Sequence, residues 1–143
     1  MIVKDIDQKS IEQVFSSLWD QAKDECHVLN ISVNDFRTSF EKMIKQPWAV
    51  AFWNGEKCFA VACLVYEGDY KWRSIFAATN EIHKFWMPVT RYIKRTSDFL
   101  INEAKGKGFI ELFTISESFY EWYDSIGFEL AASDGTVDKY IKR

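Results

Sequence analysis

The sequence predicts a mixed α/β (α+β) fold in which helices flank a mostly antiparallel central sheet. Strand-like apolar runs over residues 48–79 are separated by Asn54-Gly55, a strong hairpin signal, and by a second turn at Gly68 and Asp69. Apolar residues then recur at three- and four-residue steps over 82–105, the spacing of one long helix. A strand, a long helix and a further strand form a crossover that pairs parallel strands, so the sheet is expected to be mixed.

The remaining elements follow from local signals. Asp7 or Ser10 can cap a first helix that extends to Ala22, and a connector is expected over 24–31. Ser32 or Asn34 can open a second helix, which Pro47 ends. The predicted strands are 2–6, 48–53, 56–66, 71–79, 109–116, 128–132 and 137–141, with a short helix over 119–126. The order is β-α-α-β-β-β-α-β-α-β-β, and the chain shows no linker or repeat, which predicts a single domain over 1–143.

Composition restricts the classes of function. The 143 residues are 48% hydrophobic and 17% aromatic, which predicts an ordered core and leaves aromatic side chains that could dock a partner. The formal net charge of −3 favours neither nucleic acid nor an anionic membrane as a partner. Three Cys in no paired pattern and two His predict a reduced compartment and no metal site.

Residues 119–129 carry the most informative motif. The segment Trp122-Tyr123-Asp124-Ser125-Ile126-Gly127-Phe128 reads as a short helix stopped by a glycine and followed at once by a strand. It resembles the aromatic-Tyr-acid-x-aliphatic-Gly-Phe signature of the GNAT acyltransferase superfamily, and the predicted order of elements matches that fold. The resemblance implies an acetyl-CoA-dependent N-acyltransferase in which Tyr123 is the general acid.

Two interpretations of the tyrosines remain open. Tyr123 could donate a proton, with Tyr120 on a nearby helical face. Alternatively, both rings pack against the sheet with their hydroxyls on water or backbone. The family's general base is usually a Glu on the fourth strand, but Glu67 and Glu81 only flank that strand here, and His83 is a further candidate.

The chain lacks the glycine-rich turn that the resemblance would lead one to expect. The superfamily binds the cofactor pyrophosphate at a glycine-rich turn, R/Q-x-x-G-x-G/A, which counting back from Gly108 places near 88–93. No glycine lies between Gly68 and Gly106, and Pro88 removes one backbone donor. The expectation is therefore no cofactor, with the groove crowded by Trp86, Met87 or Tyr92.

The alternative is that acetyl-CoA binds through side-chain charge. The candidate cofactor-binding cations are Arg91, Lys94 and Arg95, with Lys84 as a further cation nearby. These four residues are equally consistent with the solvated face of a helix.

A narrower resemblance is to small bacteriophage GNAT-like proteins that lack the glycine turn, including the internal virion protein A of podophages. It rests on residues 76–82, on Arg91-Tyr92-Ile93-Lys94-Arg95 and on the motif ending at Phe128. It implies a bacteriophage virion or assembly (structural) protein in the virion or host cytoplasm, without acetyl transfer. Its partners would be other virion or assembly proteins, as a homo- or hetero-oligomer. The alternative is a divergent N-acyltransferase acting on an amine.

Overall fold

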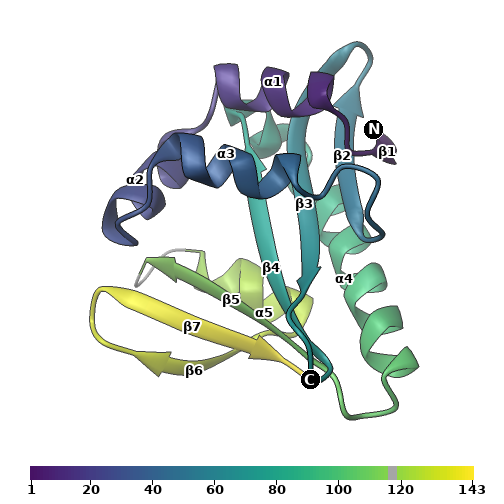
Figure 1. Ribbon diagram of the computed structural model, residues 1–143, viewed down its shortest axis with the longest axis vertical. Coiled ribbons are helices and arrows are strands. Elements are labelled where there is room, and N and C mark those ends of the chain that lie inside the picture. Colours follow the sequence, from purple (N-terminus) through teal and green to yellow (C-terminus); the bar gives the residue numbers. More distant parts are fainter. Residues whose placement is uncertain (116–118) are drawn as a thin grey trace. The chain divides into compact units, whose positions relative to one another are not determined.

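The computed structural model describes residues 1–115 and 119–143 and confirms the predicted fold class. Seven strands form one sheet in the order β1-β2-β3-β4-β5-β7-β6 (Figure 1). The strands are β1 (Ile2–Asp5), β2 (Ala49–Asn54), β3 (Lys57–Tyr66), β4 (Lys71–Ala78), β5 (Phe109–Ile115), β6 (Glu129–Ser133) and β7 (Val137–Lys142). The helices are α1 (Gln8–Ser16), α2 (Asp20–Val28), α3 (Val33–Glu41), the 3-10 helix η1 (Asn80–Lys84), α4 (Trp86–Glu103) and α5 (Tyr120–Ile126).

The chain divides into two compact units. The first, the N-terminal unit, comprises Met1–Leu64 and Ile75–Trp86, and the second, the C-terminal unit, comprises Val65–Ser74 and Met87–Arg143.

In the N-terminal unit, β2 pairs antiparallel with both β1 and β3. Gly55 has φ +61° in the turn between β2 and β3, which confirms the hairpin expected at Asn54-Gly55. The rings of Phe15 on α1 and of Phe36 and Phe40 on α3 lie within 6 Å of one another, and this aromatic cluster packs α1 against α3.

The expected first helix is in fact two helices. α1 begins as predicted, because Asp7 and Ser10 form a reciprocal capping box. The helix ends at Ser16, and the next residues instead join the end of β4: the Trp19 N–H donates to the Ala78 carbonyl, and Leu18 bridges Thr79. α2 then occupies most of the stretch expected to be a connector, so the chain has one more helix before β2 than predicted.

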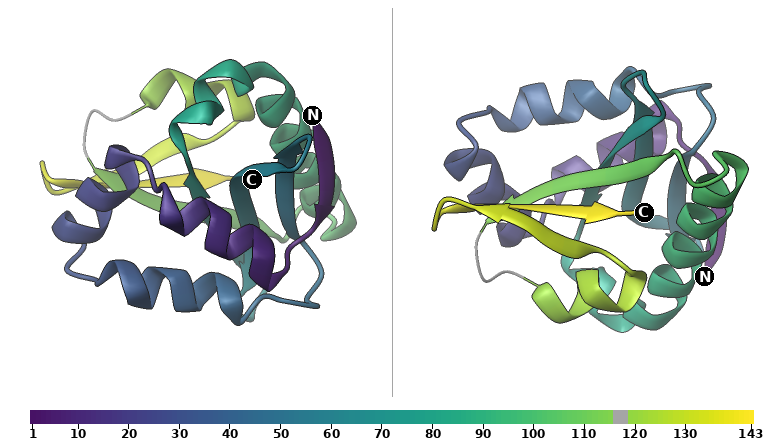
Figure 2. Two further views of the ribbon diagram at one scale, coloured as in Figure 1. Left: turned by 90° about the horizontal axis from the view of Figure 1, so that it is seen from above. Right: turned by 90° about the horizontal axis from the view of Figure 1, so that it is seen from below.

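In the C-terminal unit, β4 pairs parallel with β5, as the crossover predicts, with Lys71 opposite Phe109 and Arg73 opposite Glu111. β7 lies between β5 and β6 and pairs antiparallel with both, so β6 is a sheet edge (Figure 2). The long helix begins later than predicted, at Trp86, because residues 80–84 form the separate turn η1.

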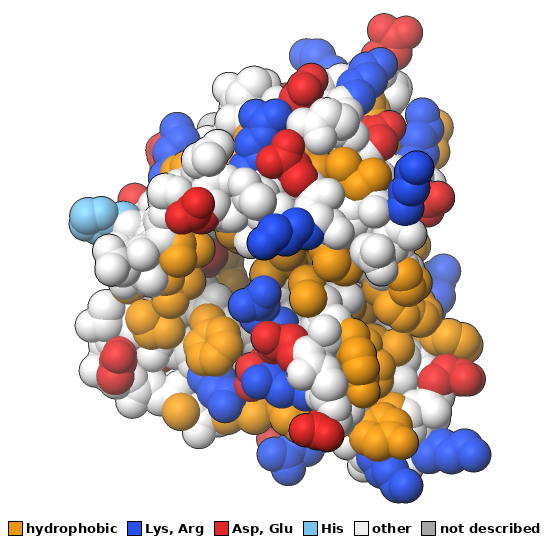
Figure 3. Space-filling model, viewed as in Figure 1, with side chains coloured by type: hydrophobic (Ala, Val, Ile, Leu, Met, Phe, Trp, Pro, Cys, Tyr) orange, Lys and Arg blue, Asp and Glu red, His pale blue; other side chains and the backbone are white. Residues whose placement is uncertain are grey.

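Charged residues of both signs are interspersed over the face that Figure 3 depicts. Within the described residues, no helix combines the length and apolar character needed to cross a membrane.

Candidate functional site

The motif helix α5 ends in the backbone geometry that its glycine predicts. Gly127 is left-handed, with φ +106°; its N–H donates to the Asp124 carbonyl, and the Phe128 N–H donates to the Tyr123 carbonyl. These two bonds form a Schellman motif, which satisfies carbonyls at the end of the helix. A Cβ at Gly127 would also lie 3.2 Å from the Lys142 Cε, so the position favours glycine for space as well as for conformation.

Tyr123, the predicted general acid, lies on the buried side of α5 with only 7% of its surface exposed. Its hydroxyl donates a hydrogen bond of 3.2 Å to the Thr114 Oγ1 on β5. Its ring lies 5.0 Å from the Tyr140 ring on β7. In this arrangement a strand hydroxyl orients the Tyr123 hydroxyl, whereas Tyr120 is 54% exposed.

A second hydrogen bond ties α5 to α4. The Trp122 indole N–H donates to the Thr90 Oγ1 at 2.6 Å. Thr90 lies in the second turn of α4, so the bond holds the start of α5 close to the N-terminal part of the long helix.

A buried lysine fixes the other end of α5. The Lys142 side chain is 5% exposed, and its ammonium donates to the Ile126 carbonyl, the Ser97 Oγ and an Asp98 carboxylate oxygen, each at 2.7 Å. Burial lowers the pKa of Lys142, and the Asp98 carboxylate opposes that shift. Three acceptors use the three donors of the ammonium, and a cation is favourable at a helix C-terminus. Lys142 therefore joins β7 to both α4 and α5.

Glu111 on β5 is a second buried charge of the same unit. Its carboxylate lies 2.7 Å from the Lys71 ammonium of β4 and 3.3 Å from that of Lys139 on β7. Burial acts to raise the pKa of Glu111, but hydrogen bonds from Lys71 and Lys139 outweigh it and hold this pKa below its ordinary value. The carboxylate is already paired with Lys71 and Lys139 and so links three neighbouring strands. Glu111 therefore has a structural role.

The connection between β4 and α4 is where an acyl-CoA pyrophosphate would bind in a GNAT protein. The placement at 88–93 was wrong, since those residues lie inside α4, and the connection is Thr79–Phe85. Three of its backbone N–H groups are used within the connection: Glu81 N–H donates to the Thr79 Oγ1, Ile82 N–H to the Thr79 carbonyl and Phe85 N–H to the Ile82 carbonyl. The residues present do not fit a glycine-rich pyrophosphate cradle.

The predicted cofactor-binding cations lie on the exposed side of α4. Arg91, Lys94 and Arg95 are all exposed, and the Lys94 ammonium is 2.7 Å from an Asp98 carboxylate oxygen. Lys84, in η1, pairs with Glu81 at 3.3 Å. The structure thus places Arg91, Lys94 and Arg95 on one helix, whereas Tyr123 is buried on another.

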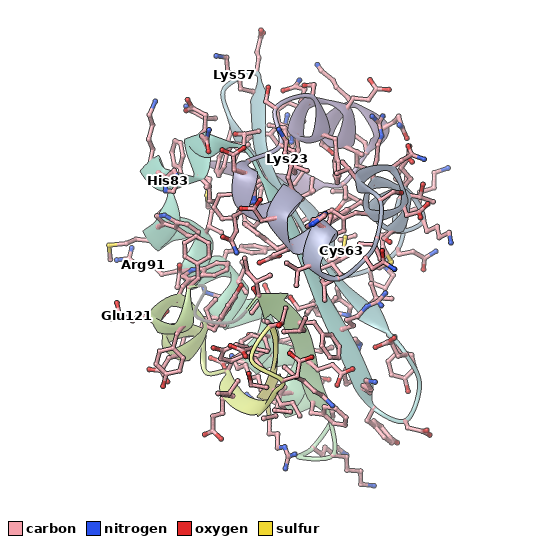
Figure 4. The ribbon with its side chains drawn as sticks, turned by 90° about the vertical axis from the view of Figure 1, so that its left-hand side faces the viewer. Lys23, Lys57, Cys63, His83, Arg91 and Glu121 are labelled. Atoms are coloured by element: carbon pink, nitrogen blue, oxygen red, sulfur yellow. The ribbon has the colours of Figure 1, made fainter. Side chains whose placement is uncertain are left out.

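The candidate bases are occupied by neighbours or exposed. Glu67 lies 3.8 Å from the Lys71 ammonium. The His83 ring accepts a 3.3 Å hydrogen bond at Nδ1 from the Trp86 indole, and the residue is exposed, as Figure 4 shows.

Nucleophilic cysteine chemistry is disfavoured by burial. Burial raises the pKa of the Cys58 and Cys63 thiols to about 12, and it also raises the pKa of Cys26. Such thiols stay protonated at neutral pH. The described residues contain no cluster of His, Cys, Asp and Glu that could hold a metal ion.

Comparisons with known proteins identify the fold. No family model matches the chain, and no curated protein matches it in sequence. Solved structures do match over nearly the whole length. An aminoglycoside 6'-acetyltransferase type Ii has a TM-score of 0.68 at 16% identity, covering 99% of this chain and 96% of the other. The PaiA N-acetyltransferase of Thermoplasma acidophilum, in complex with coenzyme A, has a TM-score of 0.67 at 12% identity, covering 99% and 98%.

A third match is the ribosomal-protein-S18-alanine N-acetyltransferase of Escherichia coli, with a TM-score of 0.61 at 13% identity, covering 98% of this chain and 90% of the other. The protein therefore has the fold of the GNAT N-acetyltransferases, as the motif at residues 119–129 predicted.

Sequence reasoning missed Thr114 and Lys142, which hold the motif in place, and Glu111, which links three strands. None of the three belongs to a motif of its own. One signal was available for Lys142. It follows Asp138 and Tyr140 at two-residue spacing along the strand, which places all three on the buried face of β7. The acceptors of its ammonium, in contrast, come from two helices that no local pattern connects.

Proposed function

We propose that the protein is an amine N-acyltransferase of the GNAT type, with an acyl-CoA thioester as the donor of the acyl group. The observation that carries the proposal is the setting of Tyr123. Its hydroxyl is oriented by Thr114, on a helix fixed at both ends by Thr90 and Lys142. Solved structures that share this fold over nearly their whole length include acetyltransferases of aminoglycosides and of spermidine, both of which are amines.

In this proposal Tyr123 stays the predicted proton donor. Because three backbone N–H groups of the connection Thr79–Phe85 are already bonded within it, the pyrophosphate of the acyl-CoA would have to be held by side chains. Arg91, Lys94 and Arg95 remain the predicted contacts for it. Coenzyme A, when bound, supplies the activated acyl group.

The test is turnover of acetyl-CoA, followed as thiol release, with an aminoglycoside, spermidine and a peptide with a free N-terminus as acceptors. Replacing Tyr123 by Phe is expected to lower kcat by about 10² while the far-ultraviolet circular dichroism stays unchanged. Tyr120→Phe is the matched control, because it removes the same hydroxyl from an exposed ring of the same helix. Absence of thiol release with every acceptor, or equal turnover in the two variants, contradicts the proposal.

A second candidate function is favoured by the internal hydrogen bonds of the connection Thr79–Phe85. We propose, as the alternative, a GNAT-fold scaffold without acyl transfer, acting through contacts with other proteins in the manner of a virion or assembly component. Its support is that Thr79 and Ile82 already accept three of the connection's backbone N–H groups, the kind of donor that a pyrophosphate would need.

Titration calorimetry with acetyl-CoA separates the two functions. The scaffold predicts no heat of binding at about 1 mM ligand, whereas the transferase predicts a dissociation constant in the micromolar range, about −8 kcal/mol at 1 μM. Micromolar binding would overturn the scaffold proposal.

A further inference from the structure

A small cavity lies in the N-terminal unit where β1, the start of α1 and the β2–β3 hairpin come together, in the upper part of Figure 1. Its volume is about 310 Å³, at the lower end of the range for sites that bind small molecules. The residues that line it are Lys4, Asp7, Lys9, Trp53, Gly55 and Glu56. Tyr123 and the cations predicted to contact the acyl donor all belong to the other unit.

Three hydrogen-bond donors without acceptors surround this cavity. The Lys4 Nζ lies 5.1 Å and the Lys9 Nζ 5.8 Å from the centre of the Trp53 ring. Among the residues that the structure describes, neither ammonium forms an ion pair or a hydrogen bond. The Trp53 indole N–H has no acceptor in the same part of the chain, although Trp53 is only 4% exposed. A buried donor without an acceptor is unfavourable, so a ligand oxygen that accepts from the indole would be stabilised there.

Hydrogen bonds from α1 hold the backbone around the cavity. The Gln13 side chain accepts the Cys58 N–H at 2.8 Å and donates to the Glu56 carbonyl at 3.3 Å, which fixes the hairpin against α1. The Asp7 carboxylate accepts the Ser10 N–H at 2.8 Å and so caps the start of α1. The walls of the cavity are therefore formed before any ligand enters.

We infer that this cavity binds a phosphate group, either free or carried by a small molecule. Two ammonium groups match the charge of a phosphate, which is close to −2, better than the single charge of a carboxylate. A phosphate also has enough acceptor oxygens for both ammonium groups and the indole N–H. Lys4 and Lys9 are exposed, so their long side chains can shift to let an oxygen reach the Trp53 indole. The N-terminal end of α1 adds the positive end of a helix dipole.

Nuclear magnetic resonance of the full chain tests the site through the assigned indole N–H resonance of Trp53. Titration with inorganic phosphate at about pH 8 and constant ionic strength should shift this resonance, with half-saturation below about 10 mM. Lys4→Gln and Lys9→Gln should each weaken binding at least about fivefold, because each removes one charged donor. Lys23→Gln, at an exposed position on α2, is the matched control and should bind phosphate as the unmodified chain does.

Glu56 provides a test in the opposite direction. Unlike the Asp7 carboxylate, that of Glu56 takes part in no hydrogen bond or ion pair among the described residues, and its charge opposes a bound anion. Glu56→Gln should therefore bind phosphate about threefold more tightly than the unmodified chain. Weaker binding by Glu56→Gln would contradict the assignment of an anion to this cavity.

Three further results would overturn the inference: a Trp53 resonance that about 50 mM phosphate leaves in place, a loss of binding in Lys23→Gln equal to that in Lys4→Gln, or half-saturation by acetate at as low a concentration as by phosphate. Glycerol 3-phosphate, titrated alongside, distinguishes a phosphate monoester from the free ion by the tighter binding of one of them. The inference is independent of acyl transfer, so acetyl-CoA should not saturate this resonance at micromolar concentration. If it does, the cavity belongs to the acyl-donor site, and an independent phosphate site is rejected.

Discussion

The Lys142 ammonium lies 2.7 Å from an Asp98 carboxylate oxygen, and this contact joins the last strand to the long helix. The same ammonium donates to the carbonyl at the end of α5, so a single buried cation connects β7, α4 and the helix that carries Tyr123.

Replacing Lys142 by Met should therefore destabilise the fold. The variant loses three hydrogen bonds and leaves the Ile126 carbonyl without this donor, which should lower the free energy of unfolding by about 2 kcal/mol in urea titrations. Lys94→Met is the matched control, because Lys94 contacts the same Asp98 at the same 2.7 Å but is half exposed. Lys94→Met should lower the free energy of unfolding by less than about 0.5 kcal/mol. Equal losses in the two variants would contradict the prediction that the buried lysine stabilises the fold more than the exposed one.

Substitution of Gly127 by Ala should cost more than substitution of another left-handed glycine. Both Gly127 and Gly55 have positive φ, at +106° and +61°, so Ala is strained at each by about 1 kcal/mol. Of these two positions, only Gly127 would bring the new Cβ against another side chain, the Lys142 Cε at 3.2 Å, which should raise the cost to about 2 kcal/mol. Thermal unfolding of the two variants under one condition measures the difference, and the prediction fails if Gly55→Ala is the less stable.

Acid should remove the stabilisation that Glu111 contributes. Its pKa is lower in the folded chain than the ordinary value of 4.5, so the folded state binds this proton less tightly than the unfolded state does. The stabilisation is complete above the unfolded pKa and is lost as the pH falls through the folded pKa. In Glu111→Gln the free energy of unfolding should fall less steeply between about pH 5 and pH 3, while Glu121→Gln, at an exposed position, should follow the unmodified chain. If the free energy of unfolding falls with the same slope between about pH 5 and pH 3 in all three proteins, this assignment is contradicted.

The cysteines should resist thiol reagents in the native state. Burial raises the pKa of Cys58 and Cys63 to about 12, and the reacting species is the thiolate. Labelling with a disulfide reagent at about pH 8 should be slow for all three thiols in buffer and fast in denaturing urea. Rapid native labelling of any thiol would show that its site opens without global unfolding.

Local signals predicted those elements whose geometry depends on nearby residues. The hairpin at Asn54-Gly55 and the helix end at Gly127 were predicted because each requires a left-handed backbone that glycine adopts without strain. The capping box of Asp7 and Ser10 depends on residues three positions apart and was equally visible. These signals, together with the order of elements, were sufficient for the fold class.

The break between α1 and α2 could not be predicted in this way. Helical spacing continues through Leu18 and Ala22, but the N–H of Trp19 bonds to the Ala78 carbonyl, on a strand remote in sequence. That hydrogen bond replaces an intrahelical one, so tertiary structure overrides local propensity. The same limit explains the misplaced start of α4, because the internal hydrogen bonds of η1 leave no pattern of apolar residues.

By itself, then, the sequence determined the fold class, the motif helix with Tyr123 and the absence of a glycine turn, because each is a property of neighbouring residues. The tertiary structure decided what surrounds them: Thr114 against the Tyr123 hydroxyl, Lys142 at the end of α5, and a connection that bonds three of its own N–H groups. Hydrogen-bond partners remote in sequence are chosen only when strands and helices pack, and packing is a property of the whole chain.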